Sequence, residues 1–233
     1  MPIRMLATTA MKTSFDELLP QFAQASGHTV DPAYGPSAQL LKRLEGGETA
    51  DAAILTGPGI DTLIRQGKVV AGTRVDIVRS AIMVAVRKGA PRPDISTVES
   101  FKQAMLAAKS IAMSNPVSGG TSGAHLAKVF EQLGIMDALK PKLTFGPGGP
   151  AGLIGNYLVR GDAEIGIQQE SELMAVPGVD LVGPLPDPIQ SVSVFALGTH
   201  AGARDGAAVR ALAQFLKTLA AIAVMKEKGL KPA

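Results

Sequence analysis

Apolar residues alternate between two spacings along the chain: short continuous runs, and longer stretches in which they return every three or four positions. The runs predict buried strands and the longer stretches predict amphipathic helices. In the first part of the chain the alternation occurs three times, with strands at 3–7, about 28–33 and 52–55 and helices at 12–24, 37–44 and 60–66. Three strand–helix units in succession predict a parallel sheet with helices on its faces.

A long apolar strand is predicted over 75–86, and a loop containing glycine and proline follows it. The pattern then repeats, with helices at 98–108, 121–133 and 152–159, strands at 110–113, 142–145, 164–168, 180–182 and 192–197, and a helical tail at 207–228. The sequence thus predicts an α/β protein of two lobes, 1–80 with 191–233 and 81–190. Each lobe has a mostly parallel sheet, and the ligand cleft is expected between them.

Three predicted strand-to-helix joints, at 7–10, 34–38 and 114–123, are rich in small, hydroxylated residues or glycine. Such joints bring backbone N–H groups and hydroxyls to a helix N-terminus, which favours an anion. Ser37 is expected to be the N-cap of its helix. Ser122 is expected to be a cap or a ligand donor. Together the joints predict a site for one small anionic solute.

Composition narrows the function further. The chain has 233 residues, of which 46% are hydrophobic, enough to bury a substantial core. It has no cysteine and only three widely spaced histidines, so no disulfide framework, metal site or cofactor is expected. The net charge is only +3, and basic residues are not interleaved with aromatic ones, which argues against a nucleic-acid partner.

The N-terminal residues lack the apolar stretch of about 7–15 residues found in secretory leaders. The chain as given is therefore expected to be cytoplasmic, or periplasmic if a leader has been removed. No later segment reaches about 18 uninterrupted apolar residues, so membrane insertion is not expected.

Residues 34–40, followed by Gly46-Gly47-Glu48 and by residues 51–55, resemble the G-x-S-x-x-L … G-x-x-A-D pattern of molybdate-binding-type solute-binding proteins. Residues 160–167 resemble that family's closing ligand strand, and the resemblance covers nearly the whole chain. It implies a type II periplasmic-binding-protein fold with two α/β lobes and a hinge near residues 80 and 190. It also implies an ABC permease partner if the chain is exported.

The resemblance is weaker for the ligand than for the fold. Molybdate binders donate hydrogen bonds from a serine in each of two loops and from a tyrosine. Ser37 matches one serine, whereas the other serine position falls on Ala10 and the tyrosine position on Gln169. A glutamine offers acceptors as well as donors, whereas a tetrahedral oxyanion takes donors only. The departures favour a carboxylate or another small organic ligand over molybdate.

Most of the residues expected to bind the ligand lie in the joints or in the glutamine pair that ends the closing strand. They are Thr8, Thr9, Ala10, Tyr34, Ser37, Thr56, Asn115, Ser118, Gly120, Thr121, Ser122, Gln168 and Gln169.

Two functions stay open. The favoured one is passive binding of a small anion. The alternative is an enzyme on the same fold, of which aconitate isomerase, similar to molybdate-type binding proteins, is an example. That chemistry needs a base that moves a proton beside a carboxylate, and His125 or Glu170 is expected to supply it. Otherwise His125 is a half-buried helix residue, and Glu170 and Glu172 are surface carboxylates near a helix start.

Overall fold

The computed structural model describes residues 1–233, and the chain divides into two compact units. Unit 1 comprises Met1–Ser80 and Ser193–Ala233, and unit 2 comprises Ala81–Val192. Strands β4 (Val75–Arg87) and β9 (Val192–Thr199) contain the two points at which the chain passes from one unit to the other. The second of these points lies two residues beyond the expected boundary at 190/191.

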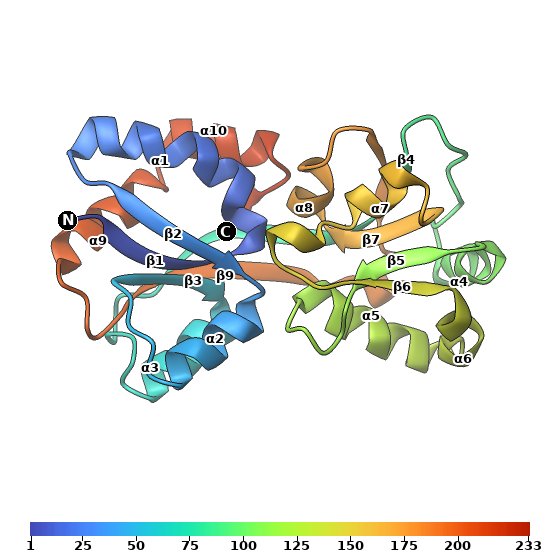
Figure 1. Ribbon diagram of the computed structural model, residues 1–233, viewed down its shortest axis with the longest axis horizontal. Helices are drawn as coiled ribbons and strands as arrows, with labels where there is room; N and C mark the ends of the chain where they lie inside the picture. Colours follow the sequence, from blue (N-terminus) through green and yellow to red (C-terminus); the bar gives the residue numbers. More distant parts are fainter. The chain divides into compact units, whose positions relative to one another are not determined.

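Unit 1 is an α/β layer structure (Figure 1). Its other strands are β1 (Ile3–Thr8), β2 (Val30–Gly35), β3 (Ala52–Thr56) and the short β10 (Lys231–Pro232), and its helices are α1 (Lys12–Ser26), α2 (Ser37–Glu45), α3 (Gly57–Arg65), α9 (Gly206–Phe215) and α10 (Leu219–Glu227). Strand β1 pairs in parallel with both β2 and β3, while β9 runs antiparallel to β3. The carboxyl ends of β1, β2 and β3 therefore share one edge of the sheet, here called the carboxyl edge.

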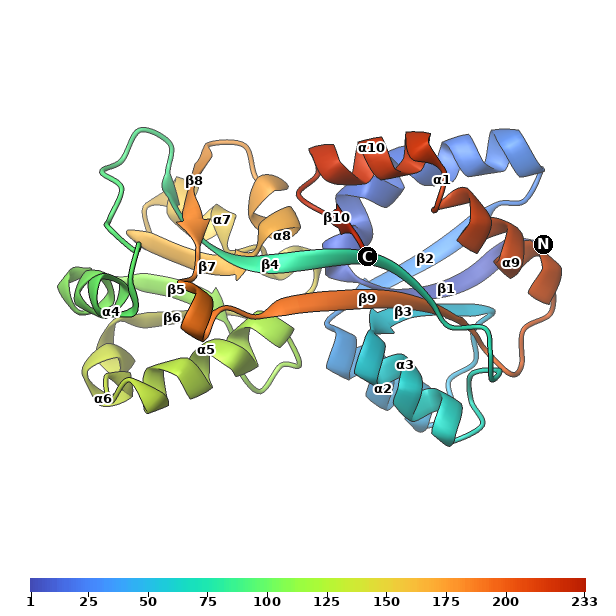
Figure 2. The same cartoon turned by 180° about the vertical axis from the view of Figure 1, so that it is seen from behind.

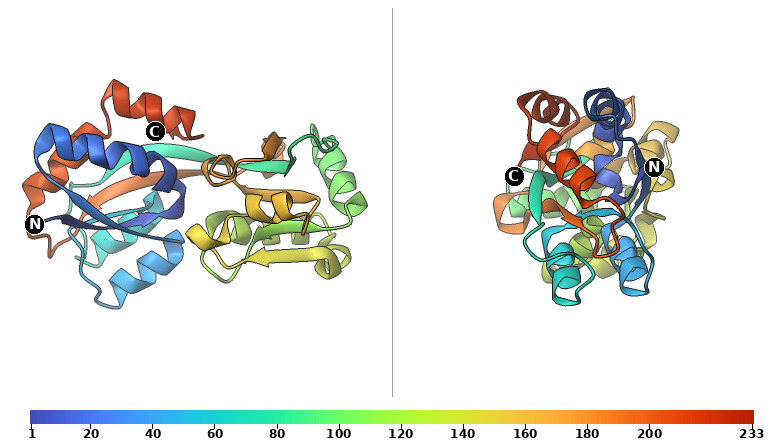
Figure 3. Two further views of the ribbon diagram at one scale, coloured as in Figure 1. Left: turned by 45° about the horizontal axis from the view of Figure 1, so that its top comes forward. Right: turned by 90° about the vertical axis from the view of Figure 1, so that its left-hand side faces the viewer.

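Two helical layers cover the unit 1 sheet. Helices α1, α9 and α10 bury Phe15, Leu212 and Met225 on one face, and α1 and α10 run side by side (Figure 2). Helices α2 and α3 bury Leu44 and Leu63 on the other face (Figure 3). The helical spacing of apolar residues in the sequence thus fixes which side of each helix meets the sheet.

Unit 2 repeats the arrangement. Its other strands are β5 (Ile111–Ser114), β6 (Leu143–Gly146), β7 (Ile165–Gln169) and β8 (Val179–Pro184), and its helices are α4 (Val98–Ala107), α5 (Thr121–Gln132), α6 (Met136–Leu139), α7 (Gly155–Arg160) and α8 (Glu170–Met174). Strand β5 pairs in parallel with β6 and β7, and β4 runs antiparallel to β7 and β8. Helices α4 and α5 bury Phe101 and Phe130 on one face, while α7 and α8 bury Leu158 and Leu173 on the other.

Two sequence expectations are wrong in detail. The predicted single helix at 207–228 is two helices, because the Thr218 hydroxyl accepts a hydrogen bond from Ala221 N–H and starts a new helix there. The N-cap of α2 is Pro36, in extended conformation, and Ser37 is the first helical residue. No single helix is long and apolar enough to span a membrane; α9 and α10 pass that test only as a pair, which bends by 68° at its break.

Candidate functional site

Some helix starts in this protein have a side-chain cap and others do not. Helices α2, α3 and α5 follow parallel strands at the carboxyl edge of their own unit, and none of the three receives a side-chain cap. Three other helices, α4, α9 and α10, are capped by the side chains of Thr97, Asp205 and Thr218. An uncapped start leaves first-turn N–H groups without a side-chain acceptor, and such groups attract anions.

Unit 1 adds buried hydroxyls to its uncapped starts. The Thr9 and Ser37 hydroxyl oxygens are both buried, and neither has a hydrogen-bond partner. They lie in neighbouring joints, because β1 pairs with β2 in a register that places Thr8 opposite Gly35. A buried hydroxyl without a partner costs about 1–3 kcal/mol, so a native protein keeps one where a ligand or water completes it. These hydroxyls can donate to a small anion.

The other predicted unit 1 residues lie around the same edge. Thr8 and Ala10 are buried, and Thr56 is the half-buried N-cap residue of α3. Tyr34 is half-buried near the end of β2, with the Lys12 ammonium 5.7 Å from its ring centroid. Burial and, to a smaller extent, the Asp16 carboxylate raise the pKa of the Tyr34 phenol, so its hydroxyl stays protonated and able to donate.

In unit 2 the joint between β5 and α5 is stabilised by its own polar groups. The Asn115 side-chain oxygen accepts from Val117 N–H at 3.0 Å, and the Ser118 hydroxyl donates to the Asn115 carbonyl at 2.9 Å. Asn115 N–H donates to the Gly146 carbonyl at 3.0 Å, which ties the joint to the end of β6. Of the predicted ligand residues, Asn115 and Ser118 thus use these groups to shape the loop.

The first turn of α5 packs directly on the end of β5. A Cβ atom at Gly123 would overlap the Ser114 carbonyl, and one at Gly120 would lie 3.2 Å from the Ser114 Cβ. Glycine at these positions lets the helix start approach the strand. The approach buries Ser122 in the first turn of α5 and leaves Gly120 as an N-cap without a side chain.

The glutamine pair connects β7 to this joint. The Gln168 side-chain oxygen accepts from Ile154 N–H at 2.8 Å, and its amide nitrogen lies 3.4 Å from the Ser114 hydroxyl oxygen. The Gln169 amide nitrogen donates to the Thr121 hydroxyl at 3.0 Å. Gln168 was predicted to bind the ligand, but its side chain is buried and both ends of its amide are hydrogen-bonded to protein groups.

Unit 2 also contains the three titratable groups that the sequence singled out, His125, Glu170 and Glu172. The His125 Nε2 atom lies 2.8 Å from the Ile189 carbonyl, which can only accept, so Nε2 carries a hydrogen and Nδ1 is left to act as a base. Glu170 is the half-buried first residue of α8. Glu172 differs from the surface carboxylate that the sequence suggested, because burial of its carboxyl group raises its pKa to about 7.

Two residues that matter here were overlooked or misjudged in the sequence. Ser114 is buried at the end of β5 and hydrogen-bonded by Gln168, and its place as the first residue of the hydroxyl-rich joint was the available signal. Glu172 lies in a helix of five residues that no apolar spacing predicts. Its burial could not be read from the sequence.

The chain matches a known protein family over nearly its whole length. The family model described as bacterial extracellular solute-binding protein matches residues 3–231. An aconitate isomerase from Pseudomonas sp is 34% identical over 236 residues, which cover 99% of this chain and 87% of that protein.

Solved structures agree in fold. The periplasmic molybdate-binding protein of Azotobacter vinelandii has a TM-score of 0.80 at 17% identity, with 99% of each chain covered. The sulfate-binding protein SubI of Mycobacterium tuberculosis has a TM-score of 0.77 at 20% identity, covering 100% of this chain and 87% of that one. At these identities the likeness concerns the fold alone.

Proposed function

The chain belongs to the bacterial extracellular solute-binding protein family, with the type II periplasmic-binding-protein fold of its molybdate-type members, and we propose that its ligand is a small organic carboxylate. The observation that carries the proposal is the pair of buried, unpartnered hydroxyls of Thr9 and Ser37 beside an uncapped helix start. Donors without acceptors select an anion, and the hydroxyls supply donors where no side-chain cap is present.

The choice of a carboxylate over an inorganic oxyanion rests on two supports. By the sequence resemblance, the position of the tyrosine donor in molybdate binders falls on Gln169, and the Gln169 amide nitrogen donates to the Thr121 hydroxyl. The relative that is 34% identical is named for aconitate, a tricarboxylate. Among solute-binding proteins of this fold, we therefore place this chain with the carboxylate binders. An ABC permease partner and an extracytoplasmic location follow as part of the same proposal.

A thermal-shift panel tests the ligand class. It compares trans-aconitate, cis-aconitate, citrate and succinate with molybdate and sulfate at equal concentrations. A ligand held at about 100 times its Kd stabilises the folded state by about 2.7 kcal/mol, which is easily seen in such a scan. We expect a tricarboxylate to give the largest shift. A larger shift with molybdate or sulfate would overturn the carboxylate proposal.

The same relative favours isomerisation as a second candidate function. A base would remove a methylene proton next to the substrate carboxylate, the electron pair would delocalise over the adjacent double bond, and a proton would return at the other allylic carbon. His125 is the first candidate for the base, because its Nδ1 atom is left to accept a proton while Nε2 donates to Ile189.

Deuterium exchange separates the two functions. If the protein is an isomerase, trans-aconitate incubated with it in heavy water should take up deuterium or form a second isomer, seen in proton spectra. His125→Ala should abolish this exchange and keep binding. Exchange that survives in His125→Ala would move the base to Glu170, and tight binding without exchange would leave passive binding as the function.

A further inference from the structure

Unit 2 contains a cavity of about 660 Å³ at the edge opposite to its candidate site residues. The cavity lies where β4 ends and β7 begins, because β4 runs antiparallel to β7 and pairs Ala85 with Gly166. Ile165 lines the cavity and begins β7, whereas Gln169 ends that strand. A strand rises about 3.3 Å per residue, so the two ends of β7 are about 13 Å apart. The cavity is thus separate from the β5–α5 joint.

Apolar side chains form most of the cavity wall. Val86, Leu158 and Ile165 line it from β4, α7 and β7, and all three are buried. The last turn of α4 contributes Ala104 and Ala107, whose short side chains fill little of the space. Cavities of about 300–1,000 Å³ with apolar walls and a few polar groups are typical of small-molecule sites. An apolar body therefore fits here.

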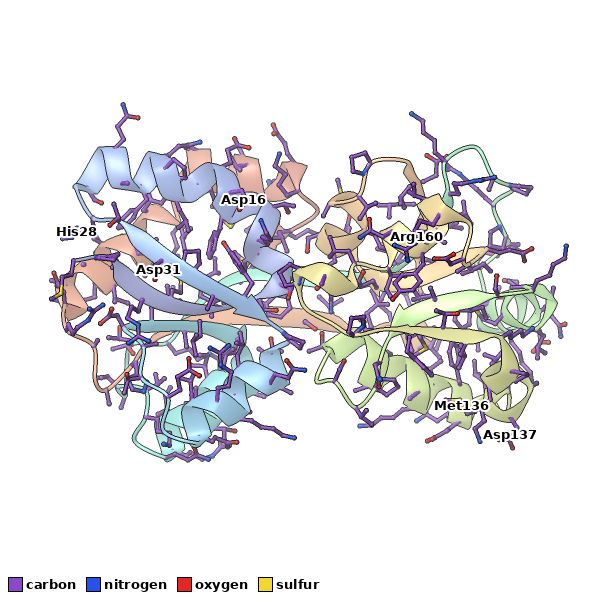
Figure 4. The ribbon with its side chains drawn as sticks, viewed as in Figure 1. Asp16, His28, Asp31, Met136, Asp137 and Arg160 are labelled. Carbon is purple, nitrogen blue, oxygen red and sulfur yellow. The ribbon has the colours of Figure 1, made fainter.

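The rim of the cavity has one cation without an ion-pair partner. Arg87, the last residue of β4, lines the cavity, is exposed and makes no ion pair. The guanidinium of the other lining arginine, Arg92, lies 3.6 Å from the Asp180 carboxylate. Arg160, the last residue of α7 and labelled in Figure 4, pairs with Asp162. Of these three arginines, only Arg87 is left to bind another anion.

The negative groups around the cavity already have partners. The Glu164 carboxylate accepts from Lys109 N–H at 2.8 Å, and the Lys109 ammonium lies 4.0 Å away. The carbonyl groups at the end of α4 would repel an anion, but the Lys142 ammonium donates to those of Leu106, at 2.6 Å, and Ala108, at 2.8 Å. The rim is therefore left with one unmatched positive charge.

We propose that this cavity is a second binding site, for a small amphipathic anion. The apolar body of the ligand occupies the alanine-lined space, and its single anionic head group pairs with the Arg87 guanidinium. A guanidinium suits a carboxylate head group, because it can donate two parallel hydrogen bonds. The site goes beyond the proposed function, since none of its lining residues belongs to the hydroxyl-rich joints or to the glutamine pair.

A series of ligands tests the chemistry of the site. Calorimetry compares hexanoate, octanoate and decanoate, and we expect affinity to rise by up to about fourfold for each added methylene that is buried. Decanol and decyltrimethylammonium should bind more weakly than decanoate, because neither has an anionic head group. Absence of decanoate binding at millimolar concentration, or equal binding of decyltrimethylammonium, overturns the inference.

Two matched pairs of variants locate the binding. Arg87→Gln should weaken decanoate binding about twofold to fivefold, the effect of an exposed ion pair, whereas Lys88→Gln removes an adjacent exposed charge outside the lining and should not. Ala107→Phe fills the cavity from the exposed end of α4 and should weaken binding by about tenfold or more. Gln103→Phe adds the same ring to an exposed position of α4 outside the lining and should not. Equal losses within either pair, or native affinity in both Arg87→Gln and Ala107→Phe, overturn the inference.

Competition separates this site from the proposed carboxylate site. Saturating trans-aconitate and the substitution Ser37→Ala should both leave decanoate affinity unchanged, because neither alters the cavity. If trans-aconitate does not bind, the carboxylate proposal fails, and the two variant pairs still decide the inference. If trans-aconitate displaces decanoate while Ala107→Phe has no effect, decanoate occupies the carboxylate site and the inference is overturned.

Discussion

At the amino end of β3, Asp51 accepts hydrogen bonds from Arg4 N–H at 2.7 Å and Arg204 N–H at 2.8 Å, and it pairs with the Arg204 guanidinium. At the opposite, carboxyl edge of the same sheet, the hydroxyls of Thr9 and Ser37 have no partner. Asp51, Thr9 and Ser37 are all buried. Buried polar groups normally find partners within the protein. Under the proposed function, the Asp51 group stabilises the fold and the two hydroxyls are kept for a ligand.

The largest effect on stability is expected at the amino end of β3, where Asp51 is hydrogen-bonded within the protein. Asp51→Ala leaves part of the Arg204 charge and two backbone N–H groups without their acceptor. Because the Arg204 side chain is 42% exposed, we expect a loss near the lower end of the range for a broken buried ion pair, about 3 kcal/mol in the free energy of unfolding. Urea unfolding measures it. Asp31→Asn, at an exposed position of β2, is the control and should leave stability unchanged.

The dependence of the unfolding free energy on acid pH gives a second test of the Asp51–Arg204 ion pair. The hydrogen bonds from Arg204 hold the pKa of Asp51 well below its usual range, which outweighs the raising effect of burial. The stabilisation is therefore fully present above the unfolded-state pKa of about 3.9 and is lost as the pH falls below it. Asp51→Ala should flatten the unfolding free energy between pH 4 and 2 relative to the native protein. Parallel curves would mean that the ion pair contributes nothing to stability.

At the carboxyl edge, where the two hydroxyls have no partner, a substitution is expected to change the affinity for the ligand. Ser37→Ala removes a donor to a buried anion, so we expect affinity for trans-aconitate to fall by about 1.5–3 kcal/mol, roughly tenfold to a hundredfold. The unfolding free energy of the ligand-free protein should stay constant or rise slightly, because the hydroxyl has no partner to lose.

Calorimetry and urea unfolding together decide between the two roles of Ser37. Ser96→Ala changes an exposed serine of unit 2 and should alter neither quantity. If Ser37→Ala lowers the stability of the free protein while affinity is retained, Ser37 belongs with Asp51 among the structural residues.

The sequence predicted the positions of these edges well, because apolar runs mark β1, β3, β5 and β7 to within a residue or two. It also located the three hydroxyl-rich joints, since their small residues interrupt the apolar spacing. It assigned Ser37 the wrong role, because the N-cap position depends on the extended backbone of Pro36 and not on which residue has a hydroxyl.

Long-range partners could not be predicted. Asp51 and Arg204 are 153 positions apart, and nothing in either local sequence indicates that they meet. Glu172 is polar and lies in a short helix, so its sequence gives no sign that its carboxyl group is withdrawn from water. Burial and pairing of this kind depend on packing between distant segments.

The smallest expected effect tests the contrast between capped and uncapped helix starts. At α4 the Thr97 hydroxyl accepts from Ser100 N–H at 3.0 Å, and Thr97 N–H donates to the Ser100 hydroxyl at 2.9 Å. Thr97→Ala removes the first of these bonds and should lower the unfolding free energy by about 1 kcal/mol, the usual cost of losing an N-cap. Because this helix start is already satisfied by its own chain, the affinity for trans-aconitate should not change. A loss of affinity in Thr97→Ala equal to that in Ser37→Ala would show that the lack of a cap does not distinguish ligand-binding helix starts from structural ones.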